Sequence, residues 1–82
     1  MSKIVSDMEE RIKQIMADIL DLDPRAIDGG ATMDTIESWD SQNHINLCLN
    51  LEQDFQVSLA VGEMEAMLSY EDILRVLKGK LE

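Results

Sequence analysis

Residues 38–55 decide the fold: a polar segment reads Ser38-Trp39-Asp40-Ser41-Gln42-Asn43-His44, and an apolar-spaced run extends from Ile45 to Phe55. Asp40 suits the N-cap of a helix, because a short carboxylate accepts hydrogen bonds from the unpaired backbone N–H groups of the first turn. Its negative charge also meets the positive end of the helix dipole. The pattern therefore predicts a helix that begins at Ser41, with the serine hydroxyl presented to solvent.

The helix expected after Asp40 has two faces of different character. One stripe at helical spacing is expected to face the core and consists of His44, Leu47, Cys48, Leu51 and Phe55. A second stripe is expected nearer solvent and consists of Gln42, Ile45, Asn46, Leu49, Glu52 and Gln53. Ile45 and Leu49 are apolar residues on this outer stripe, close to Ser41, which suggests a docking surface for a partner, although single exposed apolar residues are also ordinary.

Helix physics alone leaves the role of Ser41 open. Serine favours helix starts for capping reasons, so Ser41 could be an ordinary polar residue of the first turn. A serine hydrolase would need a base and an oxyanion site. His44 is three residues away, but the chain has no Gly-x-Ser-x-Gly elbow and little material for a substrate cleft. His44 and Cys48 could form a thiolate pair one turn apart, although a buried thiol beside a histidine is the commoner arrangement.

The rest of the chain predicts three further helices. The first runs from Ser2 to Leu20, and its apolar stripe consists of Ile4, Val5, Met8, Ile12, Ile15, Met16, Ile19 and Leu20. A short helix covers Val61 to Met67 and places Met64 and Met67 toward the core. The last helix has Ser69 as N-cap, Asp72 as the acid of a capping box, and a fraying end at residues 78–80. We therefore expect one domain, residues 1–82, folded as an all-α four-helix bundle with three long helices and one short helix.

A long loop, about Asp21 to Trp39, connects the first two of these helices. Pro24 is expected to end the first helix, because proline cannot continue the hydrogen-bond ladder. Gly29-Gly30 is expected to supply a turn with positive φ. A loop of this length needs apolar anchors on the helices, and the candidates are Ile27, Met33, Ile36 and Trp39.

Charge and composition narrow the classes of partner. The formal net charge of −10, from 17 acidic and 7 basic residues, argues against nucleic acid and anionic membranes and favours partners with basic patches. No apolar run could span a bilayer, no signal peptide is visible, and the single Cys48 cannot form an internal disulfide, so we expect a cytoplasmic monomer. A calcium loop counted from Asp21 would have Arg25 and Ala26 at its fifth and sixth positions, and one Cys with one His cannot build a zinc site, so no metal is expected.

The segment Asp40-Ser41, followed by Leu47, Leu51 and Phe55, resembles the phosphopantetheine-attachment motif of the acyl carrier protein family. In that family an Asp-Ser-Leu triplet opens the second helix, and the serine carries 4′-phosphopantetheine. Residues 51–57, Leu-Glu-Gln-Asp-Phe-Gln-Val, resemble the family's Leu-Glu-x-x-Phe-x-Val ending of that helix, and the helical pattern on either side agrees over nearly the whole chain. The Trp39-Asp40-Ser41 form is similar to that of free-standing carriers in dedicated pathways. Gln42 is a departure, because the family usually has Leu there.

The resemblance implies a carrier that catalyses nothing itself. Ser41, beside Asp40, would bear covalent 4′-phosphopantetheine, whose thiol holds acyl intermediates as thioesters for fatty acid, polyketide or other dedicated acyl-transfer pathways. The implied partners are a phosphopantetheinyl transferase and acyl-loading, acyl-transfer or condensing enzymes, and the docking candidates are Gln42, Ile45, Asn46, Leu49 and Glu52. A medium acyl chain could enter the bundle at a pocket lined by His44, Leu47, Cys48, Leu51, Phe55, Met64 and Met67. Two alternatives stay open: an aminoacyl or peptidyl carrier, and an unmodified protein-interaction module with the same fold.

Overall fold

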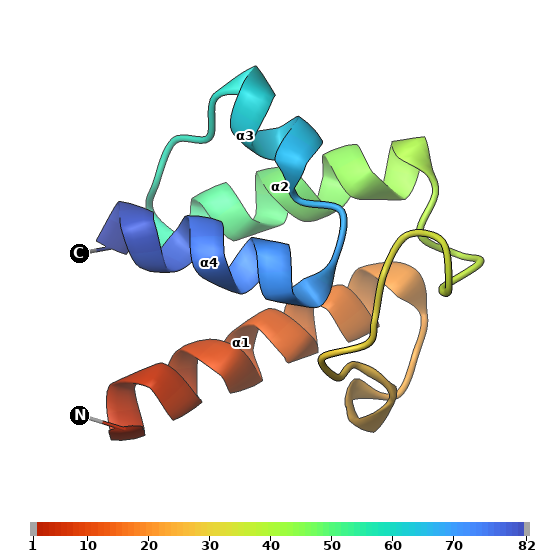
Figure 1. The fold of residues 1–82 in the computed structure, drawn as a ribbon, viewed down its shortest axis with the longest axis horizontal. Coiled ribbons are helices and arrows are strands. Elements are labelled where there is room, and N and C mark those ends of the chain that lie inside the picture. Colours follow the sequence, from red (N-terminus) through yellow and green to blue (C-terminus); the bar gives the residue numbers. More distant parts are fainter. Residues whose placement is uncertain (1, 82) are drawn as a thin grey trace.

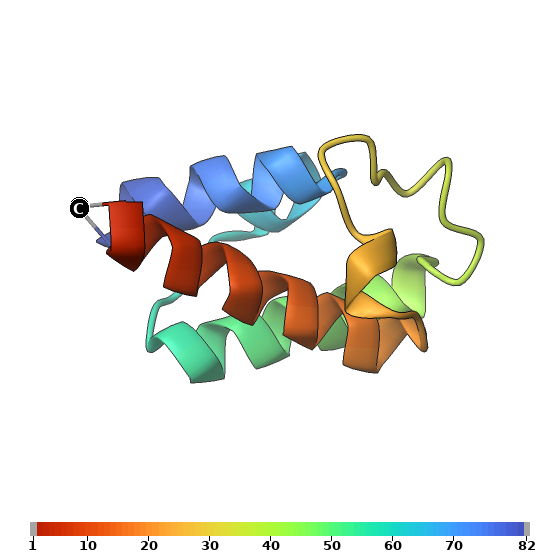
Figure 2. The same ribbon diagram turned by 90° about the horizontal axis from the view of Figure 1, so that it is seen from below.

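The computed structural model describes residues 2–81, with side chains described from residue 7 to residue 81, and its regular elements in that range are helices (Figure 1). They are α1 (Ser2–Leu20), the single 3₁₀ turn η1 (Pro24–Ala26), α2 (Ser41–Phe55), α3 (Val61–Ala66) and α4 (Tyr70–Leu81). α1 runs antiparallel to α2 and α4, so the long loop and the starts of α2 and α4 share one end of the bundle (Figures 1 and 2). The predicted all-α bundle of three long helices and one short helix is confirmed.

The core lies where α1, α2 and α4 converge, and it is aliphatic and rich in methionine. Its fully buried helical side chains include Ile12, Met16, Leu20, Leu47, Leu51, Ile73 and Leu77. Within each long helix these residues recur every four positions, which is the spacing that turns one face of a helix inward. The predicted apolar stripe of α1 is confirmed from Met8 onward, whereas the side chains of Ile4 and Val5 lie outside the described residues.

α1 ends at Leu20, directly before residues 21–24, as predicted, but Asp21 rather than Pro24 terminates it, which corrects the expected cause. Asp21 adopts the left-handed backbone conformation, with φ of 57°, and the amide of Leu22 donates to the carbonyl of Ala17 at 2.9 Å. Such a closure satisfies one of the last helical carbonyls. Pro24 is instead the first residue of η1, directly after the N-cap Asp23, a position where the backbone N–H would have no partner within the turn.

The turn at Gly29-Gly30 forms without positive φ at either glycine, contrary to the prediction. Asp28 supplies this turn, because its Oδ1 accepts from the amide of Gly30 at 2.9 Å and its carbonyl accepts from the amide of Ala31 at 3.0 Å. A side chain that bonds the backbone two residues ahead stabilises a turn in ordinary backbone regions. The four predicted loop anchors are confirmed as buried or half-buried residues of the core: Ile27, Met33, Ile36 and Trp39.

The middle of the loop is held by the connection between α3 and α4. The amide of Met33 donates to the carbonyl of Leu68, and the amide of Tyr70 donates to the carbonyl of Ala31, both at 3.0 Å. The two segments thereby form an isolated antiparallel bridge. The loop that leads to the start of α2 is therefore fixed against the far end of α3.

α3 and α4 differ slightly from their predicted bounds. α3 ends at Ala66, one residue early, and the end of α4 that was expected to fray is helical to Leu81. Ser69 caps α4 as predicted, since its Oγ accepts from the amide of Asp72 at 3.0 Å. The carboxylate of Asp72 pairs with Arg75 at 2.6 Å rather than completing a capping box.

Candidate functional site

The start of α2 has the local geometry that the sequence predicts. Asp40 is the N-cap in extended backbone conformation, and its Oδ1 accepts from the amide of Asn43 at 2.9 Å. Its carbonyl oxygen accepts from the amide of His44 at 2.8 Å, which closes the first helical turn. Ser41 is the first residue of α2 and is exposed, so its hydroxyl is accessible from solvent.

The segment before Ser41 is anchored from two directions. The hydroxyl of Ser38 donates to the carbonyl of Leu20, the last residue of α1, at 2.8 Å. The side-chain amide of Asn43 donates to the carbonyl of Ser38 at 2.7 Å. Trp39, which follows Ser38, is only 1% exposed, so the backbone that presents Ser41 is held by both polar and apolar contacts.

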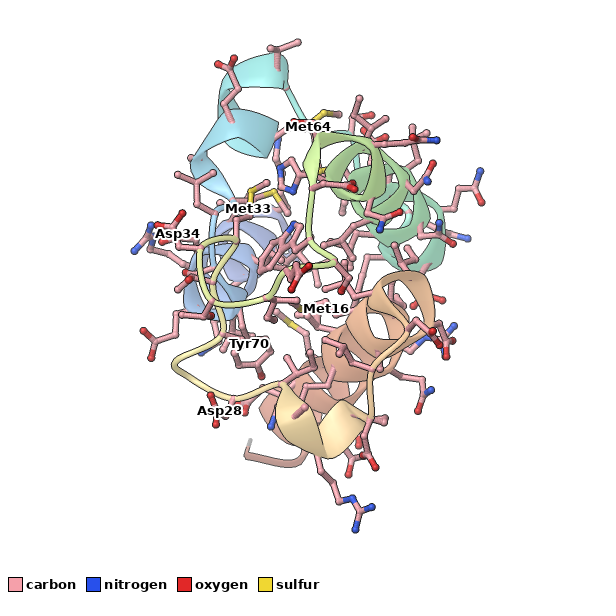
Figure 3. The ribbon with its side chains drawn as sticks, turned by 90° about the vertical axis from the view of Figure 1, so that its right-hand side faces the viewer. Met16, Asp28, Met33, Asp34, Met64 and Tyr70 are labelled. Atoms are coloured by element: carbon pink, nitrogen blue, oxygen red, sulfur yellow. The ribbon has the colours of Figure 1, made fainter. Side chains whose placement is uncertain are left out.

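A hydrogen-bonded chain from Trp39 through His44 to Met64 connects the start of α2 with α3. The indole Nε1 of Trp39 lies 3.0 Å from Nδ1 of His44, and Nε2 of His44 lies 2.7 Å from the backbone oxygen of Met64. Since an indole N–H can only donate, Nδ1 is the acceptor and Nε2 carries the proton that is donated to Met64. Figure 3 shows Met64 between α3 and the start of α2.

The sequence reasoning missed this series of hydrogen bonds, although Trp39 and His44 lie only five residues apart, on either side of the N-cap Asp40. The contact with Met64 joins residues 20 positions apart, and no local pattern predicts it. Because both nitrogens of the His44 ring are engaged, the ring is not placed to act as a base toward Ser41. The geometry therefore argues against the serine hydrolase alternative.

Cys48 is a buried thiol, as the commoner of the two sequence interpretations expects. Its Sγ lies 3.8 Å from Nε2 of His44. Burial first, and the negative charge of Glu52 second, raise the pKa of the Cys48 thiol to about 11. A reactive cysteine needs a lowered pKa, so Cys48 is not poised as a nucleophile.

The seven predicted pocket residues come together on the inner side of α2 and beneath α3. Leu47, Cys48, Leu51 and Met67 are buried members of the core, and Phe55 and Met64 are partly buried residues packed against it. His44 is half-buried and reaches Met64 as described. We call the junction where His44 of α2 bonds Met64 of α3, with Cys48 beside His44, the α2–α3 seam.

Most of the predicted docking residues are exposed on α2. Gln42 and Asn46 are exposed, as are the apolar side chains of Ile45 (59%) and Leu49 (48%). Glu52 is half-buried, because its carboxylate accepts from the amide of Leu59 at 2.7 Å and so has a structural role. The sequence reasoning missed two further exposed apolar residues, Val61 at the start of α3 and Leu68 in the connection between α3 and α4.

A surface hollow of about 550 Å³ lies beneath the loop, where Leu20, Ile36 and Ser38 are among its lining residues, and no predicted site residue lines it. The described residues contain no group of three or more His, Cys, Asp or Glu side chains suited to a metal ion. Among these same residues, no helix has the length and apolar character needed to cross a membrane.

Comparisons with known proteins agree with the resemblance seen in the motif. The chain is 29% identical over 76 residues to the acyl carrier protein of Thermosynechococcus vestitus (strain NIES-2133 / IAM M-273 / BP-1), and the match covers 93% of this chain and 94% of that protein. The fold is similar to the solution structure of a holo acyl carrier protein from Geobacter metallireducens, with a TM-score of 0.79 and 25% identity over 89% of this chain and 84% of that chain. No protein-family model matches the chain. The predicted resemblance to the acyl carrier protein family is therefore confirmed, both in sequence over nearly the whole chain and in fold.

Proposed function

We propose that this protein is an acyl carrier protein whose Ser41 carries 4′-phosphopantetheine. The observation that supports this function most directly is the position of one hydroxyl. Ser41 is exposed, stands first in α2 and follows an aspartate N-cap on a firmly anchored segment. A transferase requires such an accessible hydroxyl, and the family motif expects it at this residue.

The start of α2 also suits the phosphodiester that the modification creates. The first-turn N–H groups and the helix dipole offer partial positive charge to an anion. Because Ser41 and Gln42 are both exposed, a group bonded to the Ser41 oxygen extends into solvent without displacing a packed side chain. When bound, the arm supplies a terminal thiol that holds the acyl group as a thioester. Cys48 does not compete for that role, because it is buried and its pKa is raised.

The proposed partners are a phosphopantetheinyl transferase and the enzymes that load, transfer or condense acyl groups in a fatty acid, polyketide or other dedicated pathway. Their docking surface is the exposed stripe of α2, centred on Ile45 and Leu49 and flanked by Gln42 and Asn46. The net charge of −10 steers basic partner surfaces toward the protein as a whole, although the stripe itself is uncharged. The protein thus acts as a tethered substrate, whose attachment raises the effective concentration of cargo at each enzyme. The proposed form is a cytoplasmic monomer, because a lone buried thiol suits a reducing compartment.

The α2–α3 seam is the proposed entrance for the acyl chain. α3 has only six residues, none of them buried, and its N-cap Ala60 has no side-chain oxygen, so α3 is the least firmly held helix of the bundle. A chain of about six to eight carbons gains on the order of 5 kcal/mol by burial, at about 0.8 kcal/mol per CH₂. Part of this gain offsets the opening of the seam. We expect a medium acyl chain to raise the melting temperature above that of the holo form, and identical melting curves would argue against sequestration.

The modification is tested by intact mass spectrometry. The purified apo protein is incubated with coenzyme A and a broad-specificity phosphopantetheinyl transferase, and we expect the mass to rise by one phosphopantetheine. Ser41→Ala should abolish the rise, whereas Ser58→Ala, which removes another exposed hydroxyl, should retain it. The proposed function would be rejected if the unaltered protein gained no mass, or if Ser41→Ala gained it.

A further inference from the structure

We propose that His44 selects cargo that carries a hydrogen-bond acceptor, a hydroxyl or keto oxygen close to the thioester, over an unsubstituted acyl chain of the same length. This inference rests on the proposed carrier function and names the class of acyl group. It starts from one atom, the Nε2–H of His44, which is directed at the backbone oxygen of Met64 across the α2–α3 seam at 2.7 Å.

His44 is the seam residue that cargo tethered to Ser41 meets first. The two residues lie three positions apart, on neighbouring turns of α2, so the half-buried ring stands one turn inside the attachment point. Cys48 follows one turn deeper and is buried. The part of the cargo nearest the thioester therefore passes His44, and the rest of the chain reaches the apolar side chains beyond it.

The hydrogen bond from Trp39 fixes the tautomer of His44 that has its donor at Nε2. The indole N–H donates to Nδ1 at 3.0 Å and cannot accept in return, so the neutral ring must carry its proton on Nε2. Trp39 is 1% exposed and cannot readily turn away. His44 is thus held in one tautomer and one orientation, and it presents a donor to whatever occupies the seam.

Cargo that enters the seam must separate His44 from Met64, because their hydrogen bond joins α2 to α3 there. Beyond the thioester carbonyl, which both kinds of cargo share, an unsubstituted chain offers no acceptor, and the sulfur of Cys48, 3.8 Å from Nε2 of His44, is a weak one. His44 is half-buried, and an N–H that loses its partner where water cannot reach it is costly, by up to the amount that shifts an equilibrium roughly tenfold. An oxygen close to the thioester would replace the Met64 carbonyl and remove that cost. The difference favours oxygenated acyl groups inside the seam.

The test compares two loaded forms, prepared by transfer of hexanoyl- or 3-hydroxyhexanoyl-phosphopantetheine from the corresponding coenzyme A thioesters, with loading verified by intact mass. Both forms carry the same arm, so the amide oxygens of the arm cannot account for a difference. We expect 3-hydroxyhexanoyl to raise the melting temperature more than hexanoyl does, by about 5 °C or more. The only His and the only Trp of the chain give unique ¹⁵N–H signals, and the His44 Nε2–H signal should shift with the hydroxylated cargo and not with its hexanoyl counterpart.

Variants separate the donor from the packing of the seam. His44→Phe fills a similar volume without a donor and should abolish the preference, whereas His44→Gln keeps a donor and should restore part of it. Cys48→Ala alters the same seam but leaves His44 and Trp39 in place, so it should keep the preference. Equal melting temperatures for the two cargoes in the unaltered protein, or a preference that persists in His44→Phe, would overturn the inference while leaving the carrier function intact. Failure of Ser41 to load would instead reject the carrier function, and the inference with it.

Discussion

Truncation of Leu51 to alanine should destabilise the bundle far more than the same truncation of Leu49, two residues earlier on α2. Leu51 is fully buried, whereas Leu49 is 48% exposed. The loss of three buried carbons costs about 2.4 kcal/mol, and the remaining cavity brings the total to about 3–4 kcal/mol. For an 82-residue domain with a stability of about 4–12 kcal/mol, this lowers the melting temperature by roughly 12–25 °C. Leu49→Ala should cost less than about 1 kcal/mol.

Urea denaturation followed by tryptophan fluorescence measures both changes, because the single Trp39 lies buried in the core. The slope of the unfolding free energy against urea should be the same in both variants, so that the midpoints alone report stability. The matched pair also separates stability from docking. Leu49→Ala should remain folded yet receive phosphopantetheine or acyl groups more slowly from a partner enzyme. If Leu49→Ala lost as much stability as Leu51→Ala, the assignment of inner and outer faces of α2 would be wrong.

Four further changes test the N-cap Asp40, the Cys48 thiol, the Tyr70 hydroxyl and the ion pair of Arg11 with Asp54. Asp40→Ala should cost about 1 kcal/mol in urea denaturation and Asp40→Asn much less, because asparagine also caps well. Burial raises the pKa of the Cys48 thiol to about 11, so the thiol ionises first in the unfolded chain and stability should fall as pH rises from about 9 to 11. In Cys48→Ala this fall should begin at higher pH and be smaller, because only Tyr70, whose pKa is raised to about 12, then contributes a slope of the same sign. Tyr70→Phe should be neutral or stabilising by calorimetry, because the buried Tyr70 hydroxyl has no hydrogen-bond partner among the described residues. The Nε of Arg11 donates to the Asp54 carboxylate at 2.7 Å and lowers the pKa of Asp54. The contribution of this pair to folding stability is therefore present above the ordinary carboxyl range and is lost as pH falls through the lowered pKa. In Arg11→Gln, NMR titration should find the pKa of Asp54 back in its usual range.

The sequence predicts α2 well because its signals are local. The N-cap Asp40, the first position of Ser41 and the inward stripe from His44 to Phe55 each follow from residue type and helical spacing within a few turns. The same holds for α1 and for the Ser69 cap of α4. Periodicity and capping act between neighbours in the chain, so they are visible before the fold is known.

Features that depend on distant contacts were not predicted. The carbonyl partner of His44 comes from α3, and the partners of the loop amides come from the connection beyond α3. The Gly29-Gly30 error has a related cause, because residue type shows which backbone conformations glycine allows, not which one the fold uses. There the side chain of Asp28 closes the turn, so positive φ is unnecessary. Similarly, Glu52 looked like a surface acid, yet its carboxylate holds the amide of Leu59.

The distribution of these contacts differs between the start of α2, which holds Ser41, and α3. The residues around Ser41 are bonded to α1 through Ser38 and to the first turn of α2 through Asp40 and Asn43.

α3, by contrast, is held mainly at its edges. Its Met64 carbonyl accepts from His44, and its Glu63 carboxylate lies 2.8 Å from the Lys80 ammonium, a pair whose side chains are both about one-third exposed. A partly exposed ion pair contributes little to stability. Displacement of α3 therefore breaks one well-placed hydrogen bond and a weak ion pair and loosens the packing of Met64, while the contacts that hold Ser41 stay in place. His44 belongs to both sets of contacts, because its amide donates to Asp40 and its ring bonds Met64, so a change in the seam would reach the segment around Ser41 through His44.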